Sequence, residues 1–365
     1  MGLQCGIIGI TNIGKTTIFN CISDNKVETS NFAFSTNKSN LGQVKIPDER
    51  LHKIDSIIHA VKIIQTSMEI IDIPGLAKGS SQGEGVGNSF LSDIRNCDAL
   101  VHVVRCFDDE NLAHVEETID PVRDKETIEF ELQVKDLESV EKRISKGIKL
   151  AKSGDKKAQL AMTTLNKCKD HLEELENLRT LDLAPEEMQY IDDLALLTLK
   201  PVMYVCNVDD QAAVDGNVHT KNFISSMEAE KTTILLIAGK IEAEIAELED
   251  IEDQEEFLGD LGLEEPGVNK LIRAAYDMLN LQTFLTAGPK EIRAWTIRKG
   301  MSAPEAAGVI HSDLQRGFIR AEVMKYNDYI ELGSEAACRD AGKLYIEGKN
   351  YIVGDGDILN IRFNV

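Results

Sequence analysis

The residues best suited to chemistry lie near the amino terminus, in a glycine-rich segment that ends in lysine and threonine. Residues 9–17 have the sequence GITNIGKTT, which matches the phosphate-loop pattern G-x-x-x-x-G-K-[ST] at every fixed position. The apolar residues 5–8 and 17–22 predict a strand before the loop and a helix after it. This arrangement directs backbone N–H groups and the positive helix end at one point. A chance glycine turn is the alternative, but the flanks favour a nucleoside triphosphate site.

Each residue type in the loop has an expected role. Gly9 and Gly14 permit the tight backbone path, and Lys15 is expected to reach the outer phosphates. The Thr16 hydroxyl is placed for Mg²⁺. We therefore expect the loop to bind the nucleotide through Asn12, Ile13, Gly14, Lys15, Thr16 and Thr17.

A second candidate follows the apolar residues 67–73, which predict another strand. That strand ends in a D-x-x-G pattern formed by Asp72 and Gly75. A phosphate-loop enzyme needs a carboxylate here to hold the metal through water, and then a glycine N–H that faces the last phosphate. Alone this motif is weak, but its place after a strand and beyond a phosphate loop strengthens it. We expect Asp72 to help hold Mg²⁺, and Lys15 and Gly75 to act in catalysis.

Two polar segments beside these motifs are candidates for nucleotide-dependent switches. Residues 24–45 follow the first helix, and the glycine-rich residues 78–88 follow the D-x-x-G pattern. A flexible linker is the alternative for the second segment, but its position favours a switch that orders with the last phosphate. His102 and His114 lie in strand-like or helix-like contexts, where a packed histidine is more common than a catalytic one.

Composition limits the classes of function. The chain has 365 residues and a net charge of −22, which argues against nucleic-acid binding through the whole surface, so any such contact must be local. Two or three domains are expected at this length. The seven cysteines are scattered without a C-x-x-C pair, which predicts buried free thiols, a reducing cytosol and no zinc site. We find no apolar run of membrane-spanning length and no signal-peptide pattern, so we expect a cytoplasmic protein.

The hydrophobic pattern divides the chain into three predicted parts. Residues 1–130 and 200–280 predict an α/β nucleotide domain, and residues 131–199 predict a helical hairpin inserted into it. Residues 281–365 predict a small α+β module without a phosphate loop. Within the insertion, the long helical patterns cover residues 131–150, 156–179 and 184–199.

The predicted hairpin carries a local run of basic residues. Lys142, Lys146 and Lys149 are spaced four and three apart, which places them on one helix face. A run of charges is usually a solvated face. In so acidic a chain, however, this stripe is the most plausible place for a phosphate backbone to bind. The full run also includes Arg143, Lys152, Lys156 and Lys157.

Several of these strings resemble a known family. The sequences DIPGL at 72–76, TAGPKE at 286–291, GFIRAE at 317–322 and RFNV at 362–365 are similar to those of the Obg-like ATPase family, the YchF subfamily of translation-factor-related phosphate-loop GTPases. The resemblance runs nearly end to end. It implies a Rossmann-like nucleotide domain, an inserted helical coiled coil and a C-terminal TGS module of β-grasp fold.

The chain departs from the family pattern near the phosphates. Thr11 stands where the family usually has proline, and residues 31–36 have the sequence NFAFST, where proline and cysteine are usual at 33 and 35. Thr36 is kept, and the resemblance implies that it joins Thr16 on Mg²⁺ when the triphosphate is bound.

The base-binding segment leaves two nucleotides open. A guanine-specific enzyme normally has N-K-x-D, whose aspartate takes both guanine N–H groups. Here Asn207 is kept, Val208 replaces the lysine, and Asp210 stands where the family usually has the glutamate associated with ATP. We expect Asn207 and Val208 to lie at the base, and we favour ATP with weaker GTP. A GTP-specific Obg-type GTPase is the alternative.

Hydrolysis needs a group that positions water. Leu76 stands where related GTPases such as Ras have a glutamine, so another group, a monovalent cation or a partner's residue must serve. Asn12 resembles the asparagine of potassium-stimulated relatives, which predicts a role for K⁺. Alternatively, Asn12 only bonds nearby backbone.

The residues and the resemblance together predict a Mg²⁺-dependent ATPase that acts as a nucleotide-gated switch on the ribosome. We expect contacts with the large subunit or ribosomal RNA, no membrane or specific DNA binding, and a monomer. A different class of function is a binding protein whose docking follows ATP occupancy, with hydrolysis incidental.

Overall fold

The computed structural model describes residues 3–23, 39–75, 86–248 and 250–364. These residues form two compact units. One unit contains Met1–Gln43 and Glu69–Leu271, and the other contains Val44–Met68 and Ile272–Val365. Thr36, Leu76 and much of both predicted switch segments lie outside the described residues.

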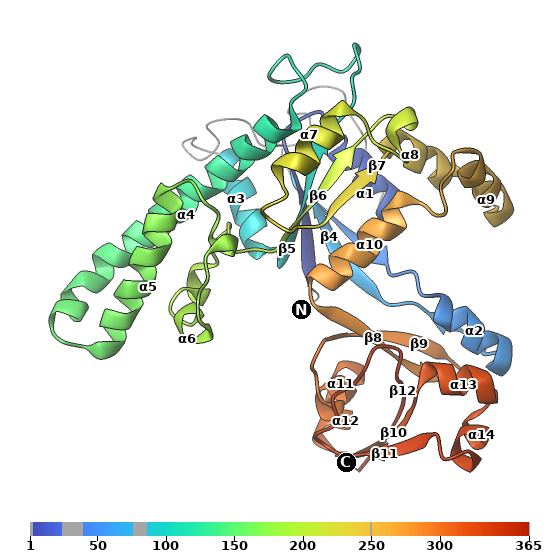
Figure 1. The fold of residues 1–365 in the computed structure, drawn as a ribbon. Helices are drawn as coiled ribbons and strands as arrows, with labels where there is room; N and C mark the ends of the chain where they lie inside the picture. Colours follow the sequence, from blue (N-terminus) through green and yellow to red (C-terminus); the bar gives the residue numbers. More distant parts are fainter. Residues whose placement is uncertain (1–2, 24–38, 76–85, 249, 365) are drawn as a thin grey trace. The chain divides into compact units, whose positions relative to one another are not determined.

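The first unit is built on a six-stranded sheet of order β2-β4-β1-β5-β6-β7 (Figure 1). β1 is parallel to both β4 and β5, and β6 and β7 continue the parallel arrangement. Strands are added on both sides of β1, so the strand order reverses there. In such sheets ligands usually bind at this point, at the carboxyl ends of the strands. The strands are β1 (Gln4–Ile8), β2 (Asn40–Lys45), β4 (Ser67–Asp72), β5 (Ala99–Arg105), β6 (Val202–Asn207) and β7 (Ile234–Ile237).

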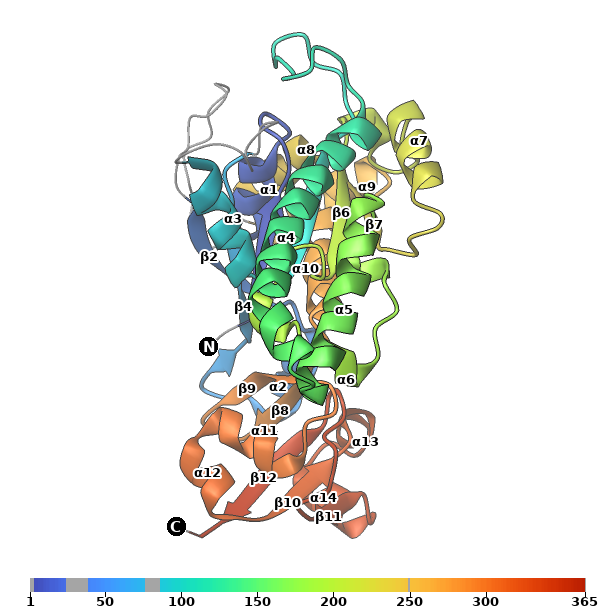
Figure 2. The ribbon, with the colours of Figure 1, turned by 90° about the vertical axis from the view of Figure 1, so that its left-hand side faces the viewer.

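Helices cover both faces of this sheet, as the predicted α/β fold requires. α3 and α4 lie against one face, and α1 and α8 lie against the other (Figures 1 and 2). Every residue of β5 is buried, which explains its unbroken apolar sequence apart from His102 and Arg105. The helices are α1 (Lys15–Ile22), α3 (Val86–Asn96), α4 (Pro121–Lys152), α5 (Lys156–Glu173), α7 (Val218–Ser226), α8 (Gly239–Glu247) and α9 (Ile251–Asp260). A further helix, α10 (Gly267–Met278), begins in the first unit and belongs to the second unit from Ile272 onward.

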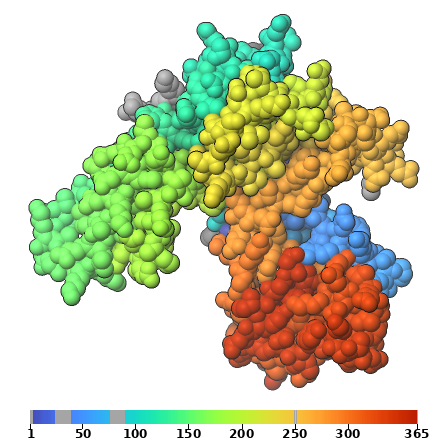
Figure 3. All heavy atoms as spheres, in the orientation of Figure 1, coloured from blue at the N-terminus to red at the C-terminus, as the bar shows by residue number. Residues whose placement is uncertain are grey.

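The predicted helical hairpin is formed by α4 and α5, which run side by side (Figure 2) and project from the rest of the first unit, in green in Figure 3. α4 begins ten residues before the predicted insertion, because the Asp120 carboxylate accepts hydrogen bonds from the N–H groups of Val122 and Arg123. Pro121 occupies the first helical position, where its missing N–H costs nothing. The hairpin core includes Val140, Leu165, Cys168 and Leu172.

A buried polar cluster ties the base of the hairpin to the sheet. The Glu129 carboxylate of α4 accepts a 2.7 Å hydrogen bond from the Tyr204 hydroxyl of β6 and pairs with Arg179. Lys125 lies 3.2 Å from the other oxygen of Glu129 and pairs with Glu230 at 2.6 Å. Buried charges that are paired in this way resist separation, so the hairpin is anchored to the nucleotide-domain sheet.

The predicted third helix over residues 184–199 is wrong. The chain forms only α6 (Pro185–Met188) and a 3₁₀ turn, η2 (Asp192–Leu194), after an earlier 3₁₀ turn, η1 (Leu178–Thr180). The Asp136 carboxylate of α4 accepts hydrogen bonds from the N–H groups of Leu197 and Thr198, at 2.8 and 2.7 Å. These tertiary bonds fix residues 197–200 in a turn, so a leucine-rich pattern does not give a helix here.

The second unit has its own six-stranded sheet, of order β11-β10-β12-β8-β9-β3. β8 and β9 form an antiparallel pair, and the core packs around Phe284, Ala306 and Val323. Its strands are β3 (Ile63–Ile64), β8 (Leu281–Ala287), β9 (Ile292–Arg298), β10 (Phe318–Met324), β11 (Leu344–Glu347) and β12 (Ile358–Phe363). Its helices are α2 (Glu49–Ile58), α11 (Ala303–Ile310), α12 (Ser312–Arg316), α13 (Tyr326–Leu332) and α14 (Glu335–Asp340).

Residues 44–68 belong to this second unit, although the sequence pattern grouped them with the nucleotide domain. Leu51 and Ile54 of α2 are fully buried against Leu285 and Ile292. β3 pairs in parallel with β9. The sequence pattern shows that α2 is amphipathic but gives no sign of which core its apolar face joins.

Candidate functional site

The phosphate-loop residues connect β1 to α1, as the motif requires. Gly9 and Gly14 have φ angles of 146° and 89°, which side-chain-bearing residues rarely adopt. A Cβ at Gly14 would lie 2.2 Å from Nδ2 of Asn207, so the loop also needs glycine for lack of space. Thr16 and Thr17 lie in the first turn of α1, where unpaired N–H groups and the helix dipole favour an anion.

Lys15 is buried beside the loop backbone. Its ammonium group donates a 2.6 Å hydrogen bond to the Ile10 carbonyl. Burial lowers the pKa of Lys15 to about 8, and the negative charge of Asp72 partly offsets this effect. A phosphate group would supply the charge that burial denies, which suits Lys15 to the predicted contact with the outer phosphates.

Thr16 and Asp72 meet in the described structure, although 56 positions separate them. Parallel pairing of Ile7 with Asp72 brings the end of β4 beside the end of β1. The Thr16 hydroxyl donates a 2.8 Å hydrogen bond to Oδ2 of Asp72. Among the described residues, Oδ1 of Asp72 is buried and makes no hydrogen bond. Burial raises the pKa of Asp72, against the attraction of Lys15 and the polar side chains of Thr16 and Asn40, which favour the charged carboxylate.

These donor groups fit a magnesium ion. A threonine hydroxyl and an aspartate carboxylate are the oxygen ligands that Mg²⁺ binds beside nucleotide phosphates. A buried carboxylate oxygen without a partner is costly unless a cation or a bound water faces it. The third predicted metal residue, Thr36, lies outside the described residues.

Gly75 lies against the phosphate loop. A Cβ at this position would come within 2.8 Å of the backbone nitrogen and Cα of Thr11. Backbone atoms cannot yield as the end of a flexible side chain can, so only glycine fits here. The D-x-x-G segment therefore reaches the loop at both of its fixed residues, Asp72 and Gly75.

Asn207 and Val208 take positions that the motif alone did not reveal. The Asn207 amide donates a 2.8 Å hydrogen bond to the Ile13 carbonyl and accepts one of 3.0 Å from the N–H group of Gly239. Asn207 thus joins the phosphate loop to the segment after β7. The Val208 side chain is buried in the core, 3% exposed. Direct contact of these side chains with the base stays a prediction.

Asp210 and Lys240 were not predicted as a pair. The Asp210 carboxylate lies 3.5 Å from the Lys240 ammonium group, and both side chains are exposed. Asp209, between Val208 and Asp210, instead accepts hydrogen bonds from the N–H groups of Gln211 and Ala212. Of these two carboxylates, Asp210 is therefore the one that could bind a nucleotide base. The Lys240 ammonium group would compete with the base for it.

A loop after β5 contacts the phosphate loop, and a buried arginine shapes it. Asn12 has a left-handed backbone, with φ of 60°, and its amide donates to the Ala113 carbonyl at 3.3 Å. Arg105 is 1% exposed and donates to the carbonyls of Phe107 and Leu112 at 3.0 and 2.9 Å. Arg105 was not predicted as a residue that holds this loop. The one sign in the sequence is that an arginine ends a largely apolar strand.

Known proteins resemble this chain both around the site and along its whole length. A family model described as a 50S ribosome-binding GTPase matches residues 4–136, and the model YchF-GTPase_C, described as a protein of unknown function, matches residues 281–364. The chain is 46% identical over 365 residues to the ribosome-binding ATPase YchF of Haemophilus ducreyi, covering all of both chains. It is 45% identical over 367 residues to the protein of the same name in Bacillus subtilis, again covering all of both. This chain belongs to the YchF family.

A solved YchF structure agrees over almost the whole chain. The Schizosaccharomyces pombe YchF GTPase superimposes with a TM-score of 0.87 at 33% identity, covering 99% of this chain and 98% of that one. The phosphate-loop α/β domain and the YchF C-terminal module are therefore confirmed. The YchF relatives differ in name: the bacterial proteins are called ATPases, and the yeast structure is called a GTPase. The names of the relatives therefore do not decide which base this chain prefers, and its own residues must decide it.

Proposed function

We propose that this chain is a Mg²⁺-dependent phosphate-loop ATPase that hydrolyses ATP to ADP and phosphate and binds the ribosome. The observation that carries the proposal is the cluster of Lys15, Thr16 and the unpartnered oxygen of Asp72 at the ends of β1 and β4. The full-length YchF relatives support nucleotide hydrolysis. We also propose that the YchF family, and this chain with it, belongs to the larger group of Obg-like ATPases.

The protein's own contribution to hydrolysis is positioning and charge. Lys15 would bind the outer phosphates, and the N–H group of Gly75 would face the last one. Thr16, Thr36 and, through water, Asp72 would hold Mg²⁺, which neutralises developing phosphate charge when bound. Asn12 would help ligate K⁺, because its amide donates through nitrogen and leaves the oxygen for a cation.

Activity of a loop variant tests this assignment. Lys15→Ala should lower ATP turnover at least about a hundredfold, as expected for loss of a charge that stabilises the transition state. Lys221→Ala, which removes an exposed lysine of α7, serves as the matched control. Unchanged turnover in Lys15→Ala would contradict the proposed catalytic site. Equal rates in Na⁺ and K⁺ buffers would remove K⁺ from it.

We infer ATP over GTP by at least tenfold, which requires about 1.4 kcal/mol. Two features support this preference: Val208 is buried and cannot cover a base as lysine does, and Lys240 lies beside Asp210. Calorimetry with both nucleotides measures the ratio directly. Equal or tighter GTP binding would favour the GTP-specific alternative, with Asp210 as the guanine-binding residue.

The ribosome is the proposed partner, through its large subunit or ribosomal RNA. The printed names of the YchF relatives and of the family model matched at residues 4–136 support this partner. We propose that residues 1–43, 69–130 and 200–280 bind the nucleotide, and that the insertion 131–199 and the TGS module 281–365 dock. We also propose a monomer in the cytoplasm. Within the described residues, no helix is long and apolar enough to cross a membrane.

An enzyme and an occupancy switch differ in what hydrolysis contributes. Co-sedimentation with purified ribosomes should differ between ATP-bound and ADP-bound protein in both cases. A variant that binds ATP but hydrolyses it slowly separates them. Loss of cellular function in that variant supports the enzyme, whereas full function, with loss only in Lys15→Ala, supports control by occupancy.

A further inference from the structure

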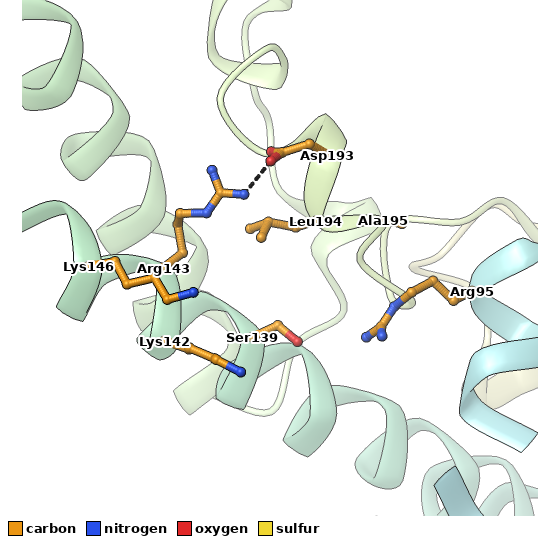
Figure 4. A pocket seen from close by; sticks show the side chains of 8 residues that line it. All are labelled: Arg95, Ser139, Lys142, Arg143, Lys146, Asp193, Leu194 and Ala195. Atoms are coloured by element: carbon orange, nitrogen blue, oxygen red, sulfur yellow. Dashed lines mark hydrogen bonds and ion pairs between the residues drawn. The ribbon is translucent and has the colours of Figure 1, made fainter. Parts of the chain in front are cut away.

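A hollow of about 320 Å³ lies between α3, α4 and the turn η2 of the first unit (Figure 4). None of the residues around it belongs to the predicted nucleotide site. Its volume falls within the range of small-ligand pockets in proteins. The residues that line the hollow are Arg95, Ser139, Lys142, Arg143, Lys146, Asp193, Leu194 and Ala195.

The polar side chains converge on the hollow from two helices. Ser139, Lys142, Arg143 and Lys146 follow the spacing i, i+3, i+4 and i+7, which places them on one face of α4. Arg95 comes from the last turn of α3 on the opposite side (Figure 4). Its carbonyl accepts a 3.0 Å hydrogen bond from the Lys200 ammonium group, which fixes the end of α3 beside the hollow.

The charge of this hollow is opposite to that of the chain. Its lining has four cations and one carboxylate, a net charge of +3, whereas the chain carries −22. Arg143 pairs with Asp193, but Arg95, Lys142 and Lys146 make no direct ion pair with any described residue, although the buried Asp136 carboxylate attracts Arg95 from a longer distance. Like charges gathered in one concavity repel one another, which is unfavourable unless an anion joins them.

Arg95 distinguishes this hollow from an ordinary solvated face. Its Nε atom is buried and has no hydrogen-bond partner among the described residues. A buried donor without a partner costs about 1–3 kcal/mol. Lysines on a solvated helix face carry no such cost, because water satisfies them. Because Nε is itself buried, an anion in the hollow would meet Arg95 through the outer nitrogens of its guanidinium group (Figure 4) and would reduce the repulsion between the cations.

We propose that this hollow is a binding site for a small phosphorylated ligand with two or more phosphate groups. Three unpaired cations suit a ligand of charge about −3, and guanidinium groups bind phosphate oxygens through paired N–H donors. The Ser139 hydroxyl adds a donor, and Leu194 and Ala195 give the hollow an apolar wall. An RNA backbone offers the same phosphate chemistry. A concavity of this size, however, encloses a small ligand more completely than a nucleic-acid strand.

Calorimetry on the full chain with inorganic tripolyphosphate tests the site, with the phosphate loop disabled by Lys15→Ala, because ADP would itself compete for the hollow. The Lys15→Ala protein should bind one tripolyphosphate, and adding the pocket substitutions Lys142→Gln/Lys146→Gln should weaken binding at least tenfold. The control Lys149→Gln/Lys152→Gln removes equal charge from the same helix outside the hollow and should change affinity less than twofold. All four lysines are exposed, so neither variant should alter thermal unfolding.

The Lys15→Ala background also separates the hollow from the nucleotide site. Tripolyphosphate binding there would support the hollow even if the proposed ATPase activity failed. Absence of binding by the Lys15→Ala protein at millimolar concentration, or equal loss in pocket and control variants, would overturn the proposal. So would binding of a 12-nucleotide RNA that the pocket variant weakens, if tripolyphosphate does not bind.

Discussion

Lys15 and Asp72 show one physical cause acting on two opposite charges. Burial lowers the pKa of Lys15 and raises that of Asp72, because a charged group of either sign loses its hydration. Their mutual attraction offsets these shifts only in part. A site that holds such charges in place, away from water, is prepared to bind phosphate and a cation.

The Asp72 carboxylate should set the Mg²⁺ requirement. Asp72→Asn keeps an oxygen that can accept the Thr16 hydrogen bond but removes the negative charge facing the cation. We expect half-maximal ATP turnover to need at least about tenfold more Mg²⁺, a change of about 1.4 kcal/mol in cation binding. A Mg²⁺ titration of turnover measures this. Glu126→Gln removes an exposed carboxylate of α4 and should leave the requirement unchanged.

Lys240 should affect the choice of base. The ammonium group lies 3.5 Å from the Asp210 carboxylate, which a guanine would need for its two N–H groups. Lys240→Ala frees Asp210, so the ratio of GTP to ATP dissociation constants should fall, by up to about fivefold for an exposed ion pair. Calorimetry with both nucleotides gives the ratio. Lys221→Ala is the control, and an unchanged ratio in Lys240→Ala would exclude this competition.

His102 should make the fold sensitive to acid. Burial lowers the pKa of His102 from 6.5 to about 3, so the unfolded chain binds a proton between these values that the folded chain does not. Stability therefore rises with pH through this window, and lowering the pH from 7 to 5 should cost about 2 kcal/mol at this residue. Urea unfolding at pH 7 and pH 5 measures the cost. His102→Gln cannot be protonated, so it should lose about 2 kcal/mol less than wild type on acidification. Equal losses would contradict this assignment.

At the scale of elements, the sequence predicts what depends on local pattern. The strand–loop–helix turn at Gly14, the strand that ends at Asp72 and the hairpin turn near Gly154 were all visible as periodicity and punctuation. The start of α4 was also recoverable, because Asp120 before Pro121 is a helix-start signal. These features need no knowledge of distant contacts.

Other elements depend on partners far along the chain. Residues 44–68 join the second unit because Leu51 and Ile54 find its core, and no local pattern names that core. The contact of Asn207 with the base stays a prediction, but the bonds of its amide to Ile13 and Gly239 could not be predicted, because only the folded sheet creates them. Likewise, Arg95 and Lys142 meet at one hollow although 47 positions separate them, so the sequence suggested a stripe and not a pocket.

The turn that follows η2, at residues 197–200, should depend on Asp136 of α4. Its carboxylate accepts hydrogen bonds from the N–H groups of Leu197 and Thr198 and from the Thr198 hydroxyl. Asp136→Ala would leave these buried donors unpaired, and we expect the free energy of unfolding to fall by about 3 kcal/mol. Urea denaturation measures the loss. Asp155→Ala removes an exposed cap at the start of α5 and should cost only about 1 kcal/mol. Equal losses would contradict the role of Asp136.

At the scale of the whole molecule, the distribution of charge matters more than its sum. A chain of net charge −22 is repelled by a polyanion as a whole, so attraction must come from a region where the sign is reversed. The exposed lysines of α4 provide such a region on a hairpin that projects from the first unit (Figure 3). Docking to ribosomal RNA through this region would release counterions from the phosphates.

Counterion release makes the ribosome contact measurable through salt. Each lysine that neutralises a phosphate contributes about 0.7–0.9 to the slope of log affinity against log salt concentration. The variant Lys146→Gln/Lys149→Gln/Lys152→Gln should therefore lower the slope for purified ribosomes by about two to three units, and it should pellet less at low salt. The control Lys221→Gln/Lys231→Gln/Lys270→Gln removes equal charge at exposed positions outside the hairpin and should keep the wild-type slope. If both variants shift the slope equally, bulk charge governs the contact. If neither shifts it, the hairpin takes no part in docking, and the second unit must supply the contact.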